Sequence, residues 1–458
     1  MKELVQKLSE QISNVETRNR TRTAEEYERF LYSIEIILKD IWLGTFIDSD
    51  YECRINKNVN WYSQNQRYRD PMITARQHLA VFEGLLSLGL IHITKDGYLD
   101  RDKNKGELTK YQARNELLDM LSEIEGNPFV RIKPNIDAEC IYLRHKVNGE
   151  TKLKGYDDDI KINQMRDNLV KINKCLIRHW CDIDILDTQY VELQKQLLVD
   201  NEKQPIDFSK RILHRIFVND SFEQGGRFYR GWWQNVPKDY RRYISIDRKQ
   251  TCEFDYAQLN PNMIYKLESK DIGETDAYDR VFEGNHRGIV KQAFNAMVQS
   301  ETPLIQKPKD IKIEVLDMSW KDLKQAIINA HKSIEHVFFK GKGNHLQFID
   351  SNIAEGVMLQ FADKDIPILP IHDSFIMHHG YGYLGELEDA MRRSYYDIFK
   401  SDIGIREEII KEIRFDKVQS EEKIEWDNID FDHIMNADND RSLWRDRNDD
   451  WDRFKGDY

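Results

Sequence analysis

Apolar residues recur at helical spacing near the start of the chain. They form one stripe beside a charged face, which is the pattern of an amphipathic helix packed on a core. The stripe consists of Leu31, Ile34, Ile37, Leu38 and Ile41. We therefore expect residues 1–48 to be mainly helical.

A second helical stripe follows, and a small strand pair is predicted after it. Leu79, Phe82 and Leu86 repeat at helical spacing, Gly89 can end the helix, and residues 90–99 are typical of a short hairpin. A helix followed by a small hairpin resembles a winged helix. DNA binding and ordinary packing are both compatible with this pattern.

The hydrophobic pattern changes near residue 206. Before it, stretches such as 164–180 and 187–199 predict long helices that would suit a thumb clasping a duplex. After it, short apolar runs at 243–246 and 252–255 predict strands. Further helices are expected at about 286–299, 320–338, 346–362 and 383–400.

The predicted fold class is α+β, in four parts. These are a helical region with a winged-helix-like segment (1–105), a helical thumb-like region (106–205), a palm with a fingers insertion (206–418) and an acidic tail (419–458). The tail is expected to be solvated, with inhibition of a basic cleft as the alternative.

Composition limits the classes of function. The net charge of −12 argues against a protein whose whole surface coats a polyanion, so any nucleic-acid site must be local. No long apolar run or secretory signal is present, which predicts a cytoplasmic protein with no membrane partner. The five cysteines form no C-x-x-C pair, which disfavours zinc and disulfides. The oligomeric state stays open.

Two aspartates are the first candidates for chemistry. Asp255 ends a strand-like run just before a predicted helix. Asp373 lies between two apolar arms, 366–371 and 374–377, which predict a hairpin with Asp373 at its tip. A helix cap and a plain turn residue are the alternative roles.

Two further segments carry candidate binding residues. Arg287, Lys291 and Phe294 fall on one helical face, where a triphosphate would satisfy both cations; a solvated pair on a core helix is the alternative. Glycines, cations and aromatics interleave over residues 225–242, which suits a nucleic-acid backbone, with a buried aromatic corner as the alternative.

Four short motifs occur in a fixed order. They are G-R-x-x-x-x-x-x-Q-N-V-P, D-Y-A-Q, R-x-x-x-K and H-D-S. Over residues 225–380 this order resembles family A DNA polymerases and the related single-subunit RNA polymerases, as a divergent and compact version. The resemblance implies a right-hand polymerase palm with small fingers, a primer and template of DNA or RNA, and a dNTP or NTP substrate.

The resemblance also implies roles for individual residues. Asp255 and Asp373 would hold two Mg²⁺ ions, with Mn²⁺ as an alternative, and Lys291 would be the proton donor. The residues implied at the nucleotide are Arg287, Lys291, Phe294, Gln258 and Asn260. Those implied at the nucleic acid are Arg227, Gln234, Asn235, Gln347 and His372.

Three departures from the family pattern leave sugar and base selection open. Asn260 stands where the DNA polymerases have a glutamate that excludes ribose, and Ser374 after the second aspartate is more like the RNA polymerases. The tyrosine expected on the fingers helix is replaced by Gln299.

The leading hypothesis is a Mg²⁺-dependent nucleotidyltransferase that extends a 3′ end as a template-directed, DNA polymerase-like enzyme. An RNA polymerase, a template-independent tailing enzyme, a metal-dependent nuclease and a non-catalytic DNA-binding palm scaffold are the alternatives.

Overall fold

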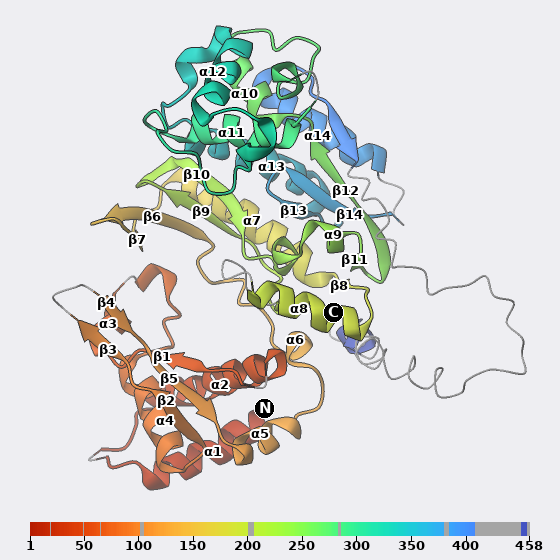
Figure 1. Ribbon diagram of the computed structural model, residues 1–458. Helices are drawn as coiled ribbons and strands as arrows, with labels where there is room; N and C mark the ends of the chain where they lie inside the picture. Colours follow the sequence, from red (N-terminus) through yellow and green to blue (C-terminus); the bar gives the residue numbers. More distant parts are fainter. Residues whose placement is uncertain are drawn as a thin grey trace, which may run out of the picture. The chain divides into compact units, whose positions relative to one another are not determined.

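The chain forms two compact units, each built from separated segments. Unit 1 comprises Met1–Glu139, Ile185–Lys210 and Phe431–Tyr458, and unit 2 comprises Cys140–Asp184 and Arg211–Asp430. The computed structural model (Figure 1) describes residues 1–18, 20–48, 50–64, 66–100, 105–199, 206–282, 285–379, 384–407 and 450–455. Both units combine helices and strands, as the predicted α+β class requires.

Unit 1 is a helical core with a small sheet. Its helices are α1 (Lys2–Val15), α2 (Ala24–Ile47), α3 (Val59–Ser63), α4 (Ala75–Ser87), α5 (Asn115–Ser122), α6 (Pro128–Arg131) and α8 (Asp187–Val199), with the 3₁₀ turn η1 (Gln66–Tyr68). Its strands are β1 (Cys53–Ile55), β2 (Ile91–Lys95), β3 (Tyr98–Asp100), β4 (Lys105–Glu107) and β5 (Thr109–Ala113).

Helix α2 confirms the helical prediction for the first stripe. Thr23 and Glu26 form a capping box that satisfies free N–H groups at its start. Ile34, Leu38 and Ile41 are completely buried in the core of unit 1. The helix is therefore fixed both by its cap and by one buried face.

The predicted hairpin at residues 90–99 is wrong in its pairing. Strand β2 pairs with β5, which also pairs with β1, whereas β3 pairs with β4. Ile93 lies opposite Tyr111 of β5, whose ring packs edge-on against Phe82 of α4. Because this cross-strand contact buries β2 in the core, a partner distant in sequence replaces the local one. Strands β3 and β4 form a separate two-stranded ribbon between β2 and β5 in the sequence.

Unit 2 contains two sheets. The four-stranded sheet has the order β10-β9-β6-β7, from β6 (Ile141–Val147), β7 (Glu150–Leu153), β9 (His214–Val218) and β10 (Ser221–Tyr229). The second sheet has the order β13-β14-β12-β11-β8, with β15 paired to β12. Its strands are β8 (Cys181–Ile183), β11 (Ile244–Ile246), β12 (Lys249–Tyr256), β13 (Leu369–Ile371), β14 (Ser374–His378) and β15 (Ile405–Glu407).

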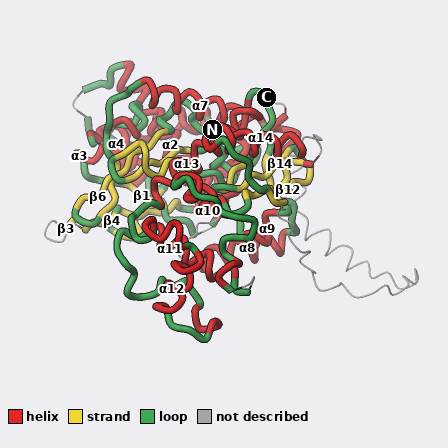
Figure 2. Tube along the Cα trace, turned by 90° about the horizontal axis from the view of Figure 1, so that it is seen from above, coloured by secondary structure: helices red, strands yellow, loops and turns green. Residues whose placement is uncertain are grey.

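The helices expected at 286–299, 346–362 and 383–400 are present in unit 2 as α11 (Arg287–Gln299), α13 (Gly343–Ala362) and α14 (Leu384–Phe399). The helix expected at 320–338 is shorter, because α12 (Trp320–Ala330) ends at Ala330 and a 3₁₀ turn follows it. The other helices of this unit are α7 (Ile160–Arg178), α9 (Lys238–Arg241) and α10 (Leu259–Leu267). Short 3₁₀ turns are η2 (Trp232–Asn235), η3 (Asp279–Val281), η4 (Ile313–Leu316) and η5 (Lys332–Val337). Figures 1 and 2 both show α10, α11 and α12 grouped together on one side of unit 2.

The prediction that residues 106–205 are mainly helical is incomplete. Alongside α7 and α8 the region contributes β6 and β7 to the four-stranded sheet and β8 to the second sheet. The alternation in β6 is short, and its parallel partner β9 lies about 70 residues later. Its antiparallel partner β7 is close in sequence, across the Asn148-Gly149 turn, and this hairpin signal was missed.

Part of the predicted acidic tail lies outside the described residues, because 408–449 are not among them. Residues 450–455 form a helical turn of unit 1 in which Phe454 is buried. Arg453 lies 3.8 Å from Glu125, which adds an ion pair within the same unit.

His179 links three segments of unit 2 at the end of α7. Its Nδ1 lies 2.7 Å from Asp247 Oδ2, in the turn between β11 and β12. Its Nε2 lies 3.0 Å from the carbonyl oxygen of Asp365, in the turn after α13. Burial lowers the pKa of His179, but the hydrogen bond and charge of Asp247, with Asp365, raise it more, so the net pKa is raised. Arg178 and Cys175 also face this cluster.

We expect His179 to make unit 2 more stable in mild acid than in base. Because the pKa of His179 is raised in the folded state, its protonation stabilises the fold. This stabilisation is complete below the ordinary histidine pKa of about 6.5 and is lost as the pH rises through the folded-state pKa. Urea unfolding of wild type and His179→Gln from about pH 5.5 to 8.5 should show a deficit of about 1 to 3 kcal/mol at low pH that narrows with rising pH. Asp247→Asn should behave in the same way, and a deficit independent of pH would contradict the charged pairing.

Candidate functional site

The two candidate aspartates lie at the same end of neighbouring strands. Strand β12 pairs with β14 so that Asp255 lies opposite Ser374, the residue directly after Asp373. The β13–β14 hairpin has His372 and Asp373 as its two turn residues, because Ile371 pairs with Ser374. Opposed residues of antiparallel strands are about 5 Å apart, so the two carboxylates come from adjacent positions. The predicted hairpin with Asp373 at its tip is confirmed.

Shared neighbours also bring these carboxylates together. The pKa of Tyr278 is raised by burial and then by Asp373, Asp276 and Asp255, while Arg287 opposes the rise. One buried hydroxyl therefore lies within electrostatic reach of Asp255 and Asp373 and of the cation that the sequence assigns to a triphosphate.

His372 occupies a left-handed backbone conformation in the hairpin turn, with φ of 60°. Its ring packs edge-on against Tyr229 at a centroid distance of 5.7 Å. Burial, and next Arg227, lowers its pKa to about 4. Near neutral pH the imidazole is thus uncharged and can act as a hydrogen-bonding group beside Asp373.

Strand β10 reaches the site through a double glycine bulge. Gly225 and Gly226 both have positive φ, and the pairing with β9 shifts register at these positions. A Cβ on Gly226 would lie 2.7 Å from Phe217 Cε1, so a larger residue would strain both the backbone and the packing. The bulge directly precedes Arg227.

Arg227 pairs with a carboxylate that the sequence did not single out. Its Nε donates to Asp350 Oδ2 at 2.7 Å, and Asp350 is 1% exposed. Burial raises the pKa of Asp350, Arg227 lowers it, and Asp373 raises it. The sequence signal for Asp350 is an acidic residue among the apolar positions of a long predicted helix.

Three predicted nucleic-acid contacts surround this pair. Gln234 donates from Nε2 to the carbonyl oxygens of Phe228 and Pro370, at 2.9 and 3.1 Å, and thereby ties β10 to the β13–β14 hairpin. Asn235 is half-buried at the end of η2, and Gln347 is half-buried on α13, one turn before Asp350. Gln234 is therefore used inside the protein, to position the hairpin.

A buried guanidinium fixes α13 against β9 and β10. Arg215 is completely buried and donates from Nε to the carbonyl oxygen of Gly226 at 2.8 Å. Its terminal nitrogens contact Glu355 Oε2 at 3.0 Å, Ser351 Oγ at 2.9 Å and Asn352 Oδ1 at 2.5 Å. Helix α13 and the glycine bulge are thus held in one register.

Helix α11 presents its predicted residues in different environments. Arg287 Nη2 lies 2.9 Å from Asp276 Oδ2, and Lys291 is exposed. Phe294 is completely buried and packs edge-on against Tyr278 and Phe338. The placement of Phe294 at a nucleotide is not supported by this arrangement, because the ring fills the core between helices.

Gln258 and Asn260 connect β12 to the helices grouped around α11. Gln258 has φ of 55°, and its Oε1 accepts a hydrogen bond from the backbone N–H of Ala277. Asn260 Nδ2 donates to Asn295 Oδ1 at 3.0 Å. Both amides are half-buried, so each fixes the segment that follows Asp255.

Arg406 is a second residue that sequence reasoning missed. It lies on β15, opposite Asp255, and its Nη2 is 3.3 Å from the same Asp276 oxygen that holds Arg287. Arg287 and Arg406 therefore converge on one carboxylate beside Asp255. The sequence gives no signal for this, because β15 lies almost 150 residues after β12 and carries no motif.

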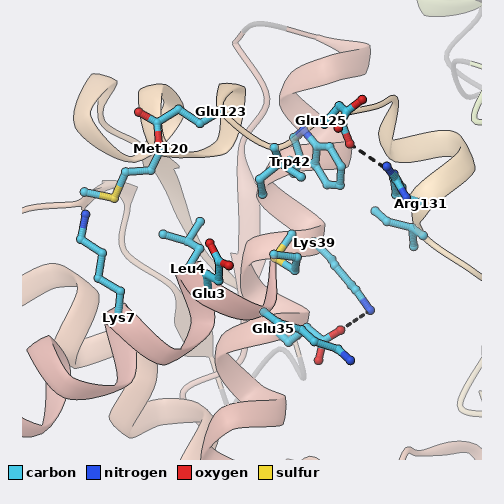
Figure 3. Close-up of a pocket in the computed structure, with 14 residues that line it drawn as sticks. Glu3, Leu4, Lys7, Glu35, Lys39, Trp42, Met120, Glu123, Glu125 and Arg131 are labelled. Carbon is cyan, nitrogen blue, oxygen red and sulfur yellow. Dashed lines mark hydrogen bonds and ion pairs between the residues drawn. The ribbon is translucent and has the colours of Figure 1, made fainter.

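Unit 1 contains a separate hollow lined by residues of α1, α2 and α5, among others (Figure 3). It has a volume of about 640 Å³, and charged residues of both signs line it. Lys39 lies 2.6 Å from Glu35, and Arg131 Nε donates to the carbonyl oxygen of Glu125 at 3.2 Å. Its mixed charges do not single out a ligand or a reaction.

Searches of protein-family profiles and of curated proteins found no match for the chain. Among the residues that the structure describes, no helix combines the length and the apolar character needed to cross a bilayer.

We expect Arg227→Met to destabilise unit 2 by about 3 to 5 kcal/mol at neutral pH, because it leaves the buried Asp350 carboxylate without its cation. The positive charge of Arg227 lowers the pKa of Asp350, so this pKa should rise in the variant. Asp350 would then become protonated as the pH falls, and the loss of stability should become smaller. Urea unfolding at about pH 5 and pH 8 measures this.

The double variant Arg227→Met/Asp350→Asn should recover part of the lost stability at the higher pH. An Arg227→Met deficit of equal size at both pH values would mean that packing, and not the charge of Asp350, causes the loss.

Proposed function

We propose that the chain is a Mg²⁺-dependent nucleotidyltransferase that extends a nucleic-acid 3′ end, most nearly as a template-directed DNA polymerase. The observation that carries this proposal is the pairing of β12 with β14, which sets Asp255 and Asp373 at adjacent positions. The four motifs occur in the same order as in the polymerases that the sequence resembles, and this order is the reason to interpret the two aspartates as metal ligands.

The donor set suits magnesium. Mg²⁺ prefers oxygen ligands and is commonly bound through one or two carboxylates together with substrate phosphates. Asp255 and Asp373 are both half-buried, so each can reach a bound ion while remaining partly solvated. When bound, two ions would activate the primer 3′-hydroxyl and stabilise the leaving pyrophosphate.

The chain's own residues would orient the two substrates. Neutral His372 and Arg227 lie within electrostatic reach of Asp373, and the resemblance assigns both to the nucleic acid. The 3′-oxygen would form a bond to the α-phosphorus, and the bond to the pyrophosphate would break. Lys291, exposed on α11, is the candidate to protonate the pyrophosphate as it leaves.

The choice between dNTP and NTP remains part of the proposal. Asn260 stands at the position that the resemblance assigns to sugar selection, and its side chain is bonded to Asn295. A neutral amide that already donates to another side chain would exclude a 2′-hydroxyl less strongly than a carboxylate would. RNA polymerase and tailing activity are therefore included in the first assay.

We expect wild type to extend a labelled primer with Mg²⁺, and both Asp255→Ala and Asp373→Ala to lower the rate at least about 10³-fold, equivalent to about 4 kcal/mol. The measurement is gel-resolved extension, with and without DNA or RNA template, using dNTPs or NTPs. Asp317→Ala, in an exposed turn of the same unit, is the matched control and should retain the wild-type rate.

Failure of wild type to extend any primer, with nucleic-acid binding intact, would favour the non-catalytic scaffold. Primer shortening in place of extension would favour the nuclease.

A second prediction concerns Asp276, which forms ion pairs with both Arg287 and Arg406 when no nucleotide is bound. Asp276→Asn keeps the oxygen that caps the backbone N–H of Tyr278 but removes the charge that competes with a triphosphate. Its KM for the nucleotide should fall about 3- to 10-fold with kcat little changed, whereas Arg406→Gln should raise KM by a similar factor. A raised KM in Asp276→Asn would show instead that Asp276 positions Arg287.

A further inference from the structure

A polar hollow of about 490 Å³ lies in unit 2, away from the two aspartates. One wall is the β6–β7 hairpin, with Arg144 and Lys146 on the same face of β6 as Thr151 of β7. The other walls are the β9–β10 turn, the end of α11 and the start of α13. These contribute Asn219, Gln299, Glu301, Gly341 and Asn344.

The lining matches the groups that bind phosphate. Arginine, lysine, asparagine, glutamine and threonine side chains, together with backbone N–H groups, supply most contacts to nucleic-acid backbones. Among the described residues neither Arg144 nor Lys146 forms an ion pair, although most other cations of this sheet do. Two available cations therefore face a hollow lined by amides.

Glu301 is the one carboxylate in the lining. It packs against Gly341, where its Cγ would lie 2.8 Å from an added Cβ. With Arg144 and Lys146 present, the hollow still carries a net positive charge even when His145 is neutral.

Helix α13 connects the hollow to the candidate active site. Asn344 lines the hollow, Gln347 follows three residues later, and Asp350 lies three residues beyond, so each is a neighbour of the next on the helix surface. At 1.5 Å per residue, Asn344 and Asp350 are about 9 Å apart along the helix. Arg144 also lies within electrostatic reach of Tyr229, which contacts the ring of His372.

We propose that this hollow binds the phosphate backbone of a single-stranded nucleic acid that leads to or from the active site. This inference rests on the proposed function. A single strand fits because the hollow is small and its amides can meet phosphate, sugar and base edges, whereas a duplex is far wider than the hollow.

The test is the salt dependence of single-strand binding. Each phosphate contact with a single strand contributes about 0.7 to the slope of log K against log salt concentration. Arg144→Gln/Lys146→Gln should bind a labelled single-stranded oligonucleotide more weakly at low salt and reduce the magnitude of the slope by about 1.4. Fluorescence anisotropy without nucleotide, between about 50 and 200 mM salt, measures this.

Lys161→Gln/Lys174→Gln is the matched control, since both lysines are exposed on α7 and the change in net charge is identical. Its slope should equal that of wild type. Contacts made elsewhere in the chain cancel, because each variant is compared with wild type.

Equal slopes for wild type and Arg144→Gln/Lys146→Gln would overturn the proposal, and so would a variant that loses affinity for a free nucleoside triphosphate while keeping affinity for the strand. Because this measurement involves no extension, it tests the strand site independently of the proposed chemistry. A reduced slope in a protein that does not extend primers would support the strand site and reject the nucleotidyl transfer.

Discussion

The buried guanidinium of Arg215 is the constraint on which the candidate site depends. A fully buried charge is strongly destabilising unless it is paired and its N–H groups have acceptors. Here the acceptors come from α13 and from the carbonyl oxygen of Gly226 in the bulge of β10. Because these acceptors belong to separate elements, satisfying Arg215 fixes the helix relative to the strand. Arg227 then directly follows the bulge and Asp350 directly precedes Ser351, so their ion pair is aligned by the same contacts.

The candidate site combines a fixed half with an adjustable half. The fixed half consists of buried pairs and backbone pairing: β12 with β14, and Arg227 with Asp350. The adjustable half consists of Arg287 and Arg406, which are more exposed and share the single carboxylate of Asp276. Because both guanidinium groups are partly exposed, an incoming anion can reach them and compete with Asp276. A site of this kind would keep the placement of Asp255 and Asp373 while the two arginines change partner.

The sequence predicted local features well and distant pairings poorly. Helices such as α2 and α11, and the hairpin carrying Asp373, follow from periodicity and turn residues within short windows. The pairing of β2 with β5, of β6 with β9 and of β15 with β12 depends on partners that no local pattern identifies. Arg406 and Asp350 were missed for this reason, since each gains its significance only from what the fold brings beside it. Phe294 was assigned from its face of the helix, but its ring is buried among other aromatic side chains while Lys291 on the same face is exposed.

The distribution of charge around the hairpin turn favours an active site over an inert scaffold. Asp373, Asp350 and Asp255 gather near one end of a sheet, and Asp373 raises the pKa of buried Asp350. Mutual repulsion of carboxylates opposes folding, and Arg227 is already engaged by Asp350. A scaffold without catalytic function could replace Asp373 by a neutral turn residue and become more stable. Retaining a half-buried carboxylate at that position makes physical sense when a cation offsets the repulsion, which is the condition that nucleotidyl transfer would supply.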